Sequence, residues 1–460
     1  MRVRAIAFNT TVLLGLAALI LAGADPGPRV NLQWPYPPSD ASPPPATLGN
    51  PQKMLPYFDD YSWKTFLAMV WPAARGRRGV PDERQTVASQ MKPKVFETFK
   101  AAWEVFHADK NGHLDGSPPA DWNYYDQGKY NACSQNVQFG DLVLASFSKF
   151  TDVGQAGFGT LDPALCGGRC GPLMARNFTF LHYLTGYNEP VFLQVQAQQL
   201  YLHVQPGVGF QASQEPGKSA LTVKSSWMEM RDFDAAHQAR YYTRDDVWVR
   251  GTDGICRKEK VGLVGLHIVQ RTLSRTQWIW TSFEQVDNVP PPDPLGSDGT
   301  FALYKAGAPD LRPYPNPYPF DPNPAVPLIF RSVRRLRPIH PSTQATNLAY
   351  REALRATGSV WQYYQLVMTQ FPIRSDLYGV EGAKPENTFP GSNYDRTDFS
   401  NVTMETFNQD DINHSCLGCH IGAGEISDFI WSLADRPTGG VQGDQFRFTM
   451  LKRLLSARPR

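Results

Sequence analysis

The sequence lacks a long hydrophobic run beyond its first 24 residues, and it carries almost no net charge. The later apolar stretches are short and interrupted by charged residues, which argues against a transmembrane helix. Its 45 lysines and arginines nearly balance 43 aspartates and glutamates, so the net charge is +2. We therefore expect no nucleic-acid partner, because the net charge is too small to attract a polyanion. We also expect no stable membrane insertion of the mature chain, because it has no long apolar run.

Cysteine is also scarce, with six in 460 residues. Two of them, Cys416 and Cys419, belong to a motif discussed below. The other four allow three pairings in an oxidising compartment. We favour Cys166–Cys170, across a short Cys-Gly-Gly-Arg-Cys turn, with Cys133–Cys256 as the remaining disulfide, and the other two pairings stay open.

The first 24 residues have the pattern of a secretory signal peptide. Arg2 and Arg4 precede an apolar run over residues 11–21, and Ala22-Gly23-Ala24 supplies the small residues of a cleavage site. We expect residues 1–24 to be removed and the mature protein to be periplasmic. An uncleaved N-terminal anchor is the alternative.

The full sequence is rich in glycine and proline, with 37 and 39 residues, which favours a folded, loop-rich protein. Residues 25–56 are predicted to be a Pro-rich irregular leader, and residues 57–460 one large domain. Helices are predicted over residues 61–72, 93–106, 177–186, 343–356, 360–370 and 446–457.

The middle of the chain changes to the alternating period of strands. Strands are predicted over residues 191–196, 200–204, 221–230, 247–250, 261–271 and 277–286. We read residues 189–286 as a central antiparallel sheet or sandwich, followed by a Pro-rich connection over residues 287–342. The fold class is therefore α+β, with helices flanking the sheet and a helical region over residues 343–460.

The chemistry is indicated by Cys416-Leu417-Gly418-Cys419-His420, a Cys-x-x-Cys-His motif. Two thiols at this spacing reach the two vinyl groups of a porphyrin, and the adjacent histidine becomes an axial ligand of the iron. We expect one covalent haem c, bound by Cys416, Cys419 and His420. Since few residues follow His420, the rest of its pocket must come from earlier in the chain, and the haem segment is integrated into the main fold.

The second axial ligand decides the reactivity of the iron. His267 is the leading candidate, because alternation within Gly265-Leu266-His267-Ile268-Val269 places it on an apolar face, although a hydrogen-bonded core histidine is the competing interpretation. Weaker candidates are the methionines Met450, Met404 and Met69. His414 lies too close to Cys416 to reach the opposite side easily, and an open position is also allowed. Trp278, Trp280 and Trp431 are candidates to pack on the macrocycle, although ordinary core packing explains each as well.

Several scattered stretches share a pattern: Ser62-Trp63-Lys64-Thr65-Phe66, Gly265-Leu266-His267-Ile268, Gln277-Trp278-Ile279-Trp280-Thr281-Ser282-Phe283-Glu284, Val360-Trp361-Gln362, and Thr403-Met404-Glu405-Thr406 leading to the haem motif. In these the sequence resembles a bacterial family of large, exported, single-haem cytochrome c proteins. The resemblance implies haem binding and redox activity outside the cytoplasm, and it carries over no substrate.

Two functions follow from these expectations. The first is electron transfer to a periplasmic redox partner protein. The second is a haem-dependent oxidoreductase, resembling a peroxidase, in which the iron is open or weakly ligated. The size of the chain favours the second, because a simple carrier does not need so many residues, whereas no acid–base pair for catalysis is evident in the sequence.

Overall fold

The computed structural model describes residues 30–109, 114–126, 128–146, 173–202, 218–251, 255–291, 301–308, 330–372, 401–406 and 427–434, with residues 409, 416 and 420. Contacts divide the chain into residues 1–31 and 32–460, and every element below belongs to the second unit. The predicted signal peptide and the predicted helix over residues 446–457 lie outside the described residues.

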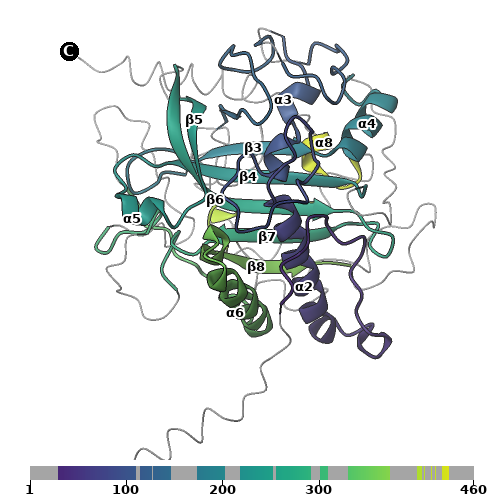
Figure 1. Ribbon diagram of the computed structural model, residues 1–460, viewed down its shortest axis with the longest axis vertical. Coiled ribbons are helices and arrows are strands. Elements are labelled where there is room, and N and C mark those ends of the chain that lie inside the picture. Colours follow the sequence, from purple (N-terminus) through teal and green to yellow (C-terminus); the bar gives the residue numbers. More distant parts are fainter. Residues whose placement is uncertain are drawn as a thin grey trace, which may run out of the picture. The chain divides into compact units, whose positions relative to one another are not determined.

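The centre of this unit is an eight-stranded mixed sheet (Figure 1). Its strands follow the order β1-β3-β4-β6-β5-β2, and β7 and β8 extend it from β6. Every pair is antiparallel except β2 with β5. The strands are β1 (Lys100–Ala101), β2 (Val143–Leu144), β3 (His182–Tyr187), β4 (Leu221–Glu229), β5 (Thr243–Arg250), β6 (Cys256–Gln270), β7 (Ile279–Gln285) and β8 (Tyr364–Gln370).

The sheet is strongly curled around its longest strand, β6. One half of β6 pairs with β5, and the other half pairs with β7 on the same side. The curl brings the chain after β2 back to β3, where Ser146 and Tyr183 form an isolated bridge. The structure thus shows a curled mixed sheet within an α+β fold. The strand pairs within residues 189–286 are antiparallel, as predicted for that range, and the sheet is mixed because β2, which precedes the range, pairs in parallel with β5.

The helices are few and lie around the sheet (Figure 1). They are α2 (Pro51–Met69), α3 (Ala102–Val105), α4 (Glu189–Ala197), α5 (Ala235–Gln238), α6 (Pro341–Ala356) and α8 (Trp431–Ala434), with 3-10 turns η1 (Pro45–Thr47), η2 (Val95–Thr98) and η3 (Val360–Tyr363). The helix α2 starts where the side chain of Asn50 accepts a hydrogen bond from the Lys53 amide and Pro51 occupies the first turn. The predicted irregular leader therefore ends before residue 51.

Helix α2 lies against one face of β7 and β8. The hydroxyl of Ser62 lies 2.8 Å from that of Thr281 and 2.7 Å from that of Thr369. Next to it, the buried carboxylate of Asp59 accepts hydrogen bonds from the hydroxyls of Thr369 and Thr343. Because the three threonines come from β7, β8 and α6, a small polar cluster joins these elements to α2 inside an otherwise apolar interface.

Two predicted strands are not strands. Residues 191–196 lie in α4, because the side chain of Asn188 caps the helix at the Val191 amide and Pro190 stands in its first turn. Residues 200–202 form a turn, and the remainder of that predicted strand lies outside the described part. The valines and glutamines of residues 191–196 are compatible with the period of a helix as well as with that of a strand. The residues that cap the helix therefore decided which of the two formed.

Three predicted helices are also wrong. Residues 93–106 form the short pieces η2, β1 and α3, residues 182–187 form β3 after an irregular start, and residues 364–370 form β8 after η3. These segments supply the strands β1, β3 and β8 to the sheet, a tertiary role that overrides local helical spacing. The predicted helices over 61–72 and 343–356 are confirmed by α2 and α6, and the four predicted strands between residues 221 and 286 by β4 to β7.

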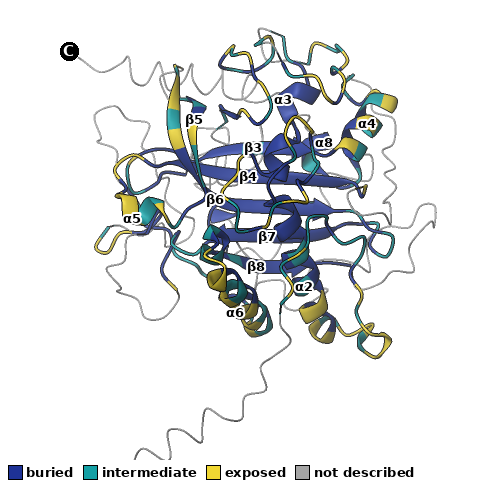
Figure 2. Ribbon diagram, viewed as in Figure 1, coloured by how far each residue is buried: buried dark blue, intermediate teal, exposed yellow. Residues whose placement is uncertain are grey.

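Strands β4 and β7 are buried along their whole lengths (Figure 2). The alternation of side chains along these two strands therefore does not separate a solvent-exposed face from a buried face, because both faces are covered. Helices α2 and α6 cover one face, and residues 401–406 and 427–434 contact the other. His420 contacts this second face through Trp280.

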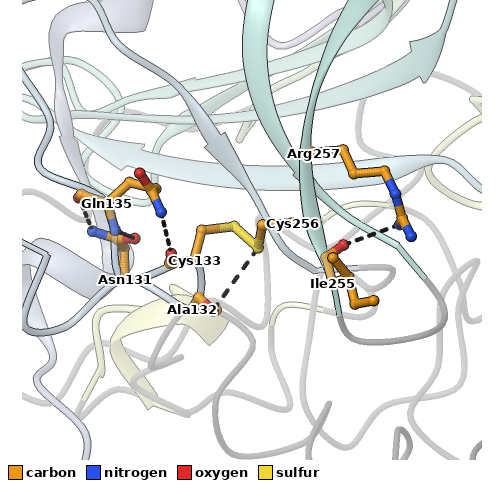
Figure 3. The surroundings of a disulfide bond; sticks show 7 residues. All are labelled: Asn131, Ala132, Cys133, Gln135, Ile255, Cys256 and Arg257. Atoms are coloured by element: carbon orange, nitrogen blue, oxygen red, sulfur yellow. Dashed lines mark hydrogen bonds between the residues drawn. A yellow bond between two sulfur atoms is a disulfide. The ribbon is translucent and has the colours of Figure 1, made fainter.

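The predicted Cys133–Cys256 disulfide is present, with the two Cα atoms 5.6 Å apart (Figure 3). It joins the loop before β2 to the start of β6, across 123 positions of sequence. Cys166 and Cys170 lie outside the described residues.

Candidate haem-attachment site

The imidazole of His420 contacts both the sheet and the chain that follows it. Its Nδ1 atom lies 2.7 Å from the carbonyl oxygen of Phe429. Its ring centre lies 4.1 Å from that of Trp280 in β7, with the planes tilted by 54°. A carbonyl oxygen only accepts hydrogen bonds, so Nδ1 is the donor in this contact.

The segment that supplies this carbonyl has an unusual backbone. Asp428 and Phe429 have φ angles of 48° and 62°, in the left-handed region that residues other than glycine seldom adopt. Trp278, with φ of 73°, donates its indole N–H to the carbonyl oxygen of Asp428 across 3.0 Å. Such conformations cost about 1–3 kcal/mol each and cluster at functional sites. Here they fix the position of the acceptor for His420.

Asp428 is the titratable group of this segment. Desolvation raises the pKa of its carboxyl to about 7, against the opposing effects of Arg271 and of the hydrogen bond from Trp278. The Arg271 Nε atom lies 3.7 Å from the carboxylate. The Asp428 carboxyl therefore changes its charge near pH 7, and it lies eight positions after His420 in the sequence.

Cys416 lies between two apolar clusters. It is partly buried and packs against a cluster that contains Trp278, Trp280 and Ile430, and also against a second cluster that contains Phe58 and Phe371. A macrocycle attached through this sulfur would start from an apolar surface, as a porphyrin needs. Cys419 lies outside the described residues.

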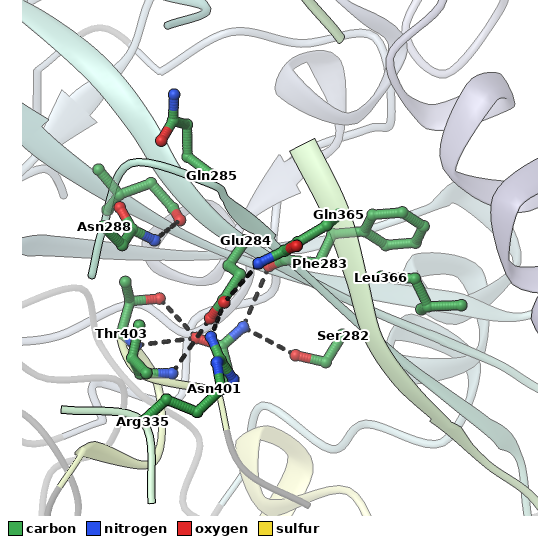
Figure 4. A network of polar contacts seen from close by, with 12 residues as sticks. Ser282, Phe283, Glu284, Gln285, Asn288, Arg335, Gln365, Leu366, Asn401 and Thr403 are labelled. Carbon is green, nitrogen blue, oxygen red and sulfur yellow. Dashed lines mark hydrogen bonds and ion pairs between the residues drawn. The ribbon is translucent and has the colours of Figure 1, made fainter. Parts of the chain in front are cut away.

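The chain before the motif is anchored to the sheet by a buried polar network (Figure 4). The side-chain amide of Asn401 donates to the Ser282 hydroxyl across 2.8 Å and to the Phe283 carbonyl across 3.1 Å. Glu284 accepts from the amide of Val402, and forms a buried ion pair with Arg335. Desolvation lowers the pKa of Arg335 to about 10.

Gly265 allows this segment to approach the sheet. A Cβ at this position would lie 2.2 Å from the Thr403 hydroxyl and 2.7 Å from that of Ser226. The two hydroxyls are themselves hydrogen bonded across 3.1 Å. No side chain fits between β6 and the segment that contains Thr403. Close packing therefore explains why a glycine occupies position 265.

His267 lies on the same sheet face as Trp280. It pairs with Ser282, and Trp280 pairs with Val269, so alternation places all four side chains on that face. Diagonal neighbours of this kind lie about 7–8 Å apart. The His267 Nε2 atom lies 3.6 Å from the Glu405 carboxylate, and the side chain of His267 is 11% exposed. The structure thus adds a carboxylate neighbour that the sequence did not indicate.

The other predicted residues fall into three groups. Met404 and Met69 are buried, Met404 within an apolar cluster of β3, β4 and β6 side chains. Met450 and His414 lie outside the described residues. Trp278 and Trp280 line the His420 site, and Trp431 starts α8 immediately after it.

Comparison with protein-family models, curated proteins and solved structures finds no match to this chain. Among the described residues, no group of three or more histidine, cysteine or acidic side chains forms a metal site of its own. Within that same part of the chain no helix is long and apolar enough to cross a membrane.

Sequence reasoning did not identify the residues that support His420. Phe429 acts through its backbone carbonyl, which leaves no signal in the side-chain pattern. Asp428 is a single acidic residue outside any motif. Nor did any motif indicate that Glu405 would lie beside His267. Only Trp278 and Trp280 had been singled out, as aromatic residues that pack near a macrocycle.

Proposed function

We propose that this protein is a periplasmic c-type cytochrome with one haem attached to Cys416 and Cys419 and ligated by His420. The hydrogen bond between His420 Nδ1 and the Phe429 carbonyl is the observation that carries the proposal. Histidines that ligate metals almost always donate their other ring nitrogen in this way, which fixes the tautomer and orients the ring.

The apolar setting supports the same assignment. Cys416 and Trp280 contact apolar clusters, and the charged pair that the described residues place beside them is Asp428 with Arg271. Bound haem would supply a one-electron Fe(III)/Fe(II) couple. The residues of this chain would orient His420, exclude water from one side of the site, and set the local charge through Asp428.

We further propose that the electron is exchanged with a redox partner protein in the periplasm. The predicted signal peptide supports export, and the Cys133–Cys256 disulfide is in keeping with an oxidising compartment. The family resemblance found in the sequence points the same way.

The second candidate function is a haem-dependent oxidoreductase. The His267–Glu405 pair favours it, because a histidine beside a carboxylate is a suitable acid–base pair, and it lies on the face of β6 and β7 that carries Trp280. In the carrier, His267 would instead be the second axial ligand. The two functions assign different tasks to one side chain.

The attachment of haem is tested by expressing the full chain with its own N-terminus in a bacterium that matures c-type cytochromes. We expect a red periplasmic protein that stains for haem after denaturing electrophoresis. Cys416→Ala with Cys419→Ala should abolish the stain, whereas Cys133→Ala with Cys256→Ala should keep it. A correctly folded but colourless wild-type protein would refute the proposal.

A further inference from the structure

A pocket of about 490 Å³ lies away from the residues that contact His420. Three stretches of chain line it, residues 87–94, 235–243 and 358–363, together with Lys260 of β6. We call it the lysine pocket, because Lys92, Lys94 and Lys260 all line it. Its other walls include the side chains of Tyr242 and Tyr363.

Lys94 is the most constrained of the three lysines. It is 1% exposed, and its ammonium group donates a hydrogen bond to the Ser89 carbonyl across 2.7 Å. An ammonium has three donors, so this bond accounts for one of them. Its Nζ atom also lies 5.8 Å from the ring centre of Tyr242 and 6.0 Å from that of Trp361.

Burial is unfavourable for this charge. The pKa of Lys94 is lowered to about 8, mainly by desolvation; Glu97 opposes this shift, and Lys92 adds a smaller lowering. The Glu97 carboxylate is already engaged by the guanidinium of Arg244 and the hydroxyl of Tyr242. The protein therefore supplies Lys94 with little counter-charge of its own.

The other two lysines share one acid at the edge of the pocket. Asp245 lies 3.7 Å from Lys92 Nζ and 3.6 Å from Lys260 Nζ. The side chains of Asp245 and Lys260 are 62% and 42% exposed. Among the described residues that line the pocket there are three lysines and no carboxylate, so the lining itself is cationic.

We propose that the lysine pocket binds a small organic polyanion that carries at least two carboxylate or phosphate groups. One anionic group would accept the remaining hydrogen bonds of Lys94, and a second would lie between Lys92 and Lys260. Lysine suits this task because it acts as a point charge and imposes no bidentate geometry. The volume exceeds what an inorganic anion needs, and the ring of Tyr242 provides an apolar wall for an organic body.

Calorimetric titration of the purified full chain tests the proposal. The probes are citrate, glucose 6-phosphate and inorganic phosphate, each at the same ionic strength set with sodium chloride. We expect saturable binding of citrate or glucose 6-phosphate, and at least tenfold weaker binding of inorganic phosphate. The comparison of the first two probes distinguishes a carboxylate ligand from a phosphate ester.

Substitutions connect the binding to the pocket. Lys94→Gln should weaken the preferred probe at least tenfold, and Lys260→Gln, at an exposed position that should fold normally, at least threefold. The control is Lys258→Gln, an exposed lysine on the same strand that does not line the pocket, and it should bind like wild type. Absence of saturable binding, or equal losses in all three variants, would overturn the proposal.

Proton uptake gives a second readout. An anion beside Lys94 raises its pKa, so binding at pH 8 should take up a fraction of a proton, measured from the heat in buffers of different ionisation enthalpy. Lys94→Gln should abolish most of this uptake. These measurements do not use haem, so the two proposals can fail separately.

Discussion

The indole N–H of Trp278 donates to the backbone carbonyl of Asp428 across 3.0 Å, although the two residues are 150 positions apart. The contact joins the start of β7 to the segment that holds His420. Both partners have left-handed backbone angles, so neither conformation is favourable by itself. The tertiary contact is what maintains them.

Trp278→Phe should therefore lower the free energy of unfolding by about 2–4 kcal/mol, since it removes buried volume and leaves a buried carbonyl without its donor. It should also reduce the fraction of chain that carries haem. Unfolding in urea and the ratio of haem absorbance to protein absorbance measure the two effects. Trp361→Phe is the matched control, because the buried indole nitrogen of Trp361 makes no hydrogen bond to the described residues. It should lose stability and keep its haem.

Asp59 should make the protein less stable as the pH rises. Desolvation raises the pKa of this carboxyl from 3.8 to about 7, against the hydrogen bonds from Thr343 and Thr369. The folded state therefore binds the proton more tightly than the unfolded state, and stability falls between about pH 4 and pH 7.

Asp59→Asn should remove this part of the pH dependence and stabilise the protein above pH 7 by up to about 4 kcal/mol, from the pKa difference. Urea unfolding at pH 5 and pH 8 measures both effects. The raised pKa of Asp428 contributes a slope of the same sign, so some dependence should persist. A variant that is equally destabilised at both pH values would contradict the interpretation.

Gly265→Ala should displace the segment that contains Thr403, because its Cβ would lie 2.2 Å from the Thr403 hydroxyl. Overpacking of this kind costs about 1–3 kcal/mol. Thr403→Ala together with Ser226→Ala removes both obstructing hydroxyls, so adding Gly265→Ala to that background should cost less. A double-mutant cycle on unfolding free energies measures the coupling, and strict additivity would contradict the close approach.

Removal of the Cys133–Cys256 disulfide should lower the free energy of unfolding by about 2–5 kcal/mol, because it closes a long loop. The double alanine variant, or reduction with dithiothreitol, provides the measurement by thermal unfolding. The haem spectrum of the variant should not change at temperatures where it remains folded, since the contacts of His420 come from other segments.

His267→Ala distinguishes the two proposed functions. If His267 is the second axial ligand, the variant should change from a low-spin to a high-spin spectrum and should bind CO. If His267 is instead an acid–base residue beside an open position, the wild type should already be high spin, react with peroxide, and lose that reactivity in the variant. A low-spin spectrum that is unchanged in the variant excludes both roles.

The sequence by itself determined which residues have a chemical role that a motif indicates. The spacing of Cys416, Cys419 and His420 predicts haem attachment because two thioethers and one ligand require that separation. Strong alternation of side chains predicted the strands β4 to β7. Because only four cysteines lie outside the Cys-x-x-Cys-His motif, Cys133–Cys256 belonged to one of only three possible pairings. These features are local, or follow from counting.

Tertiary structure decided the rest. Residues 364–370 became β8 because β7 offered an unpaired edge, despite their helical spacing. The hydrogen-bond acceptor for His420 is the backbone carbonyl of Phe429. Every residue type has such a carbonyl, so no sequence pattern indicates it. Glu405 meets His267 only because Gly265 lets a distant segment reach β6. Backbone groups and contacts across long separations leave no periodic signal, so only the folded chain reveals them.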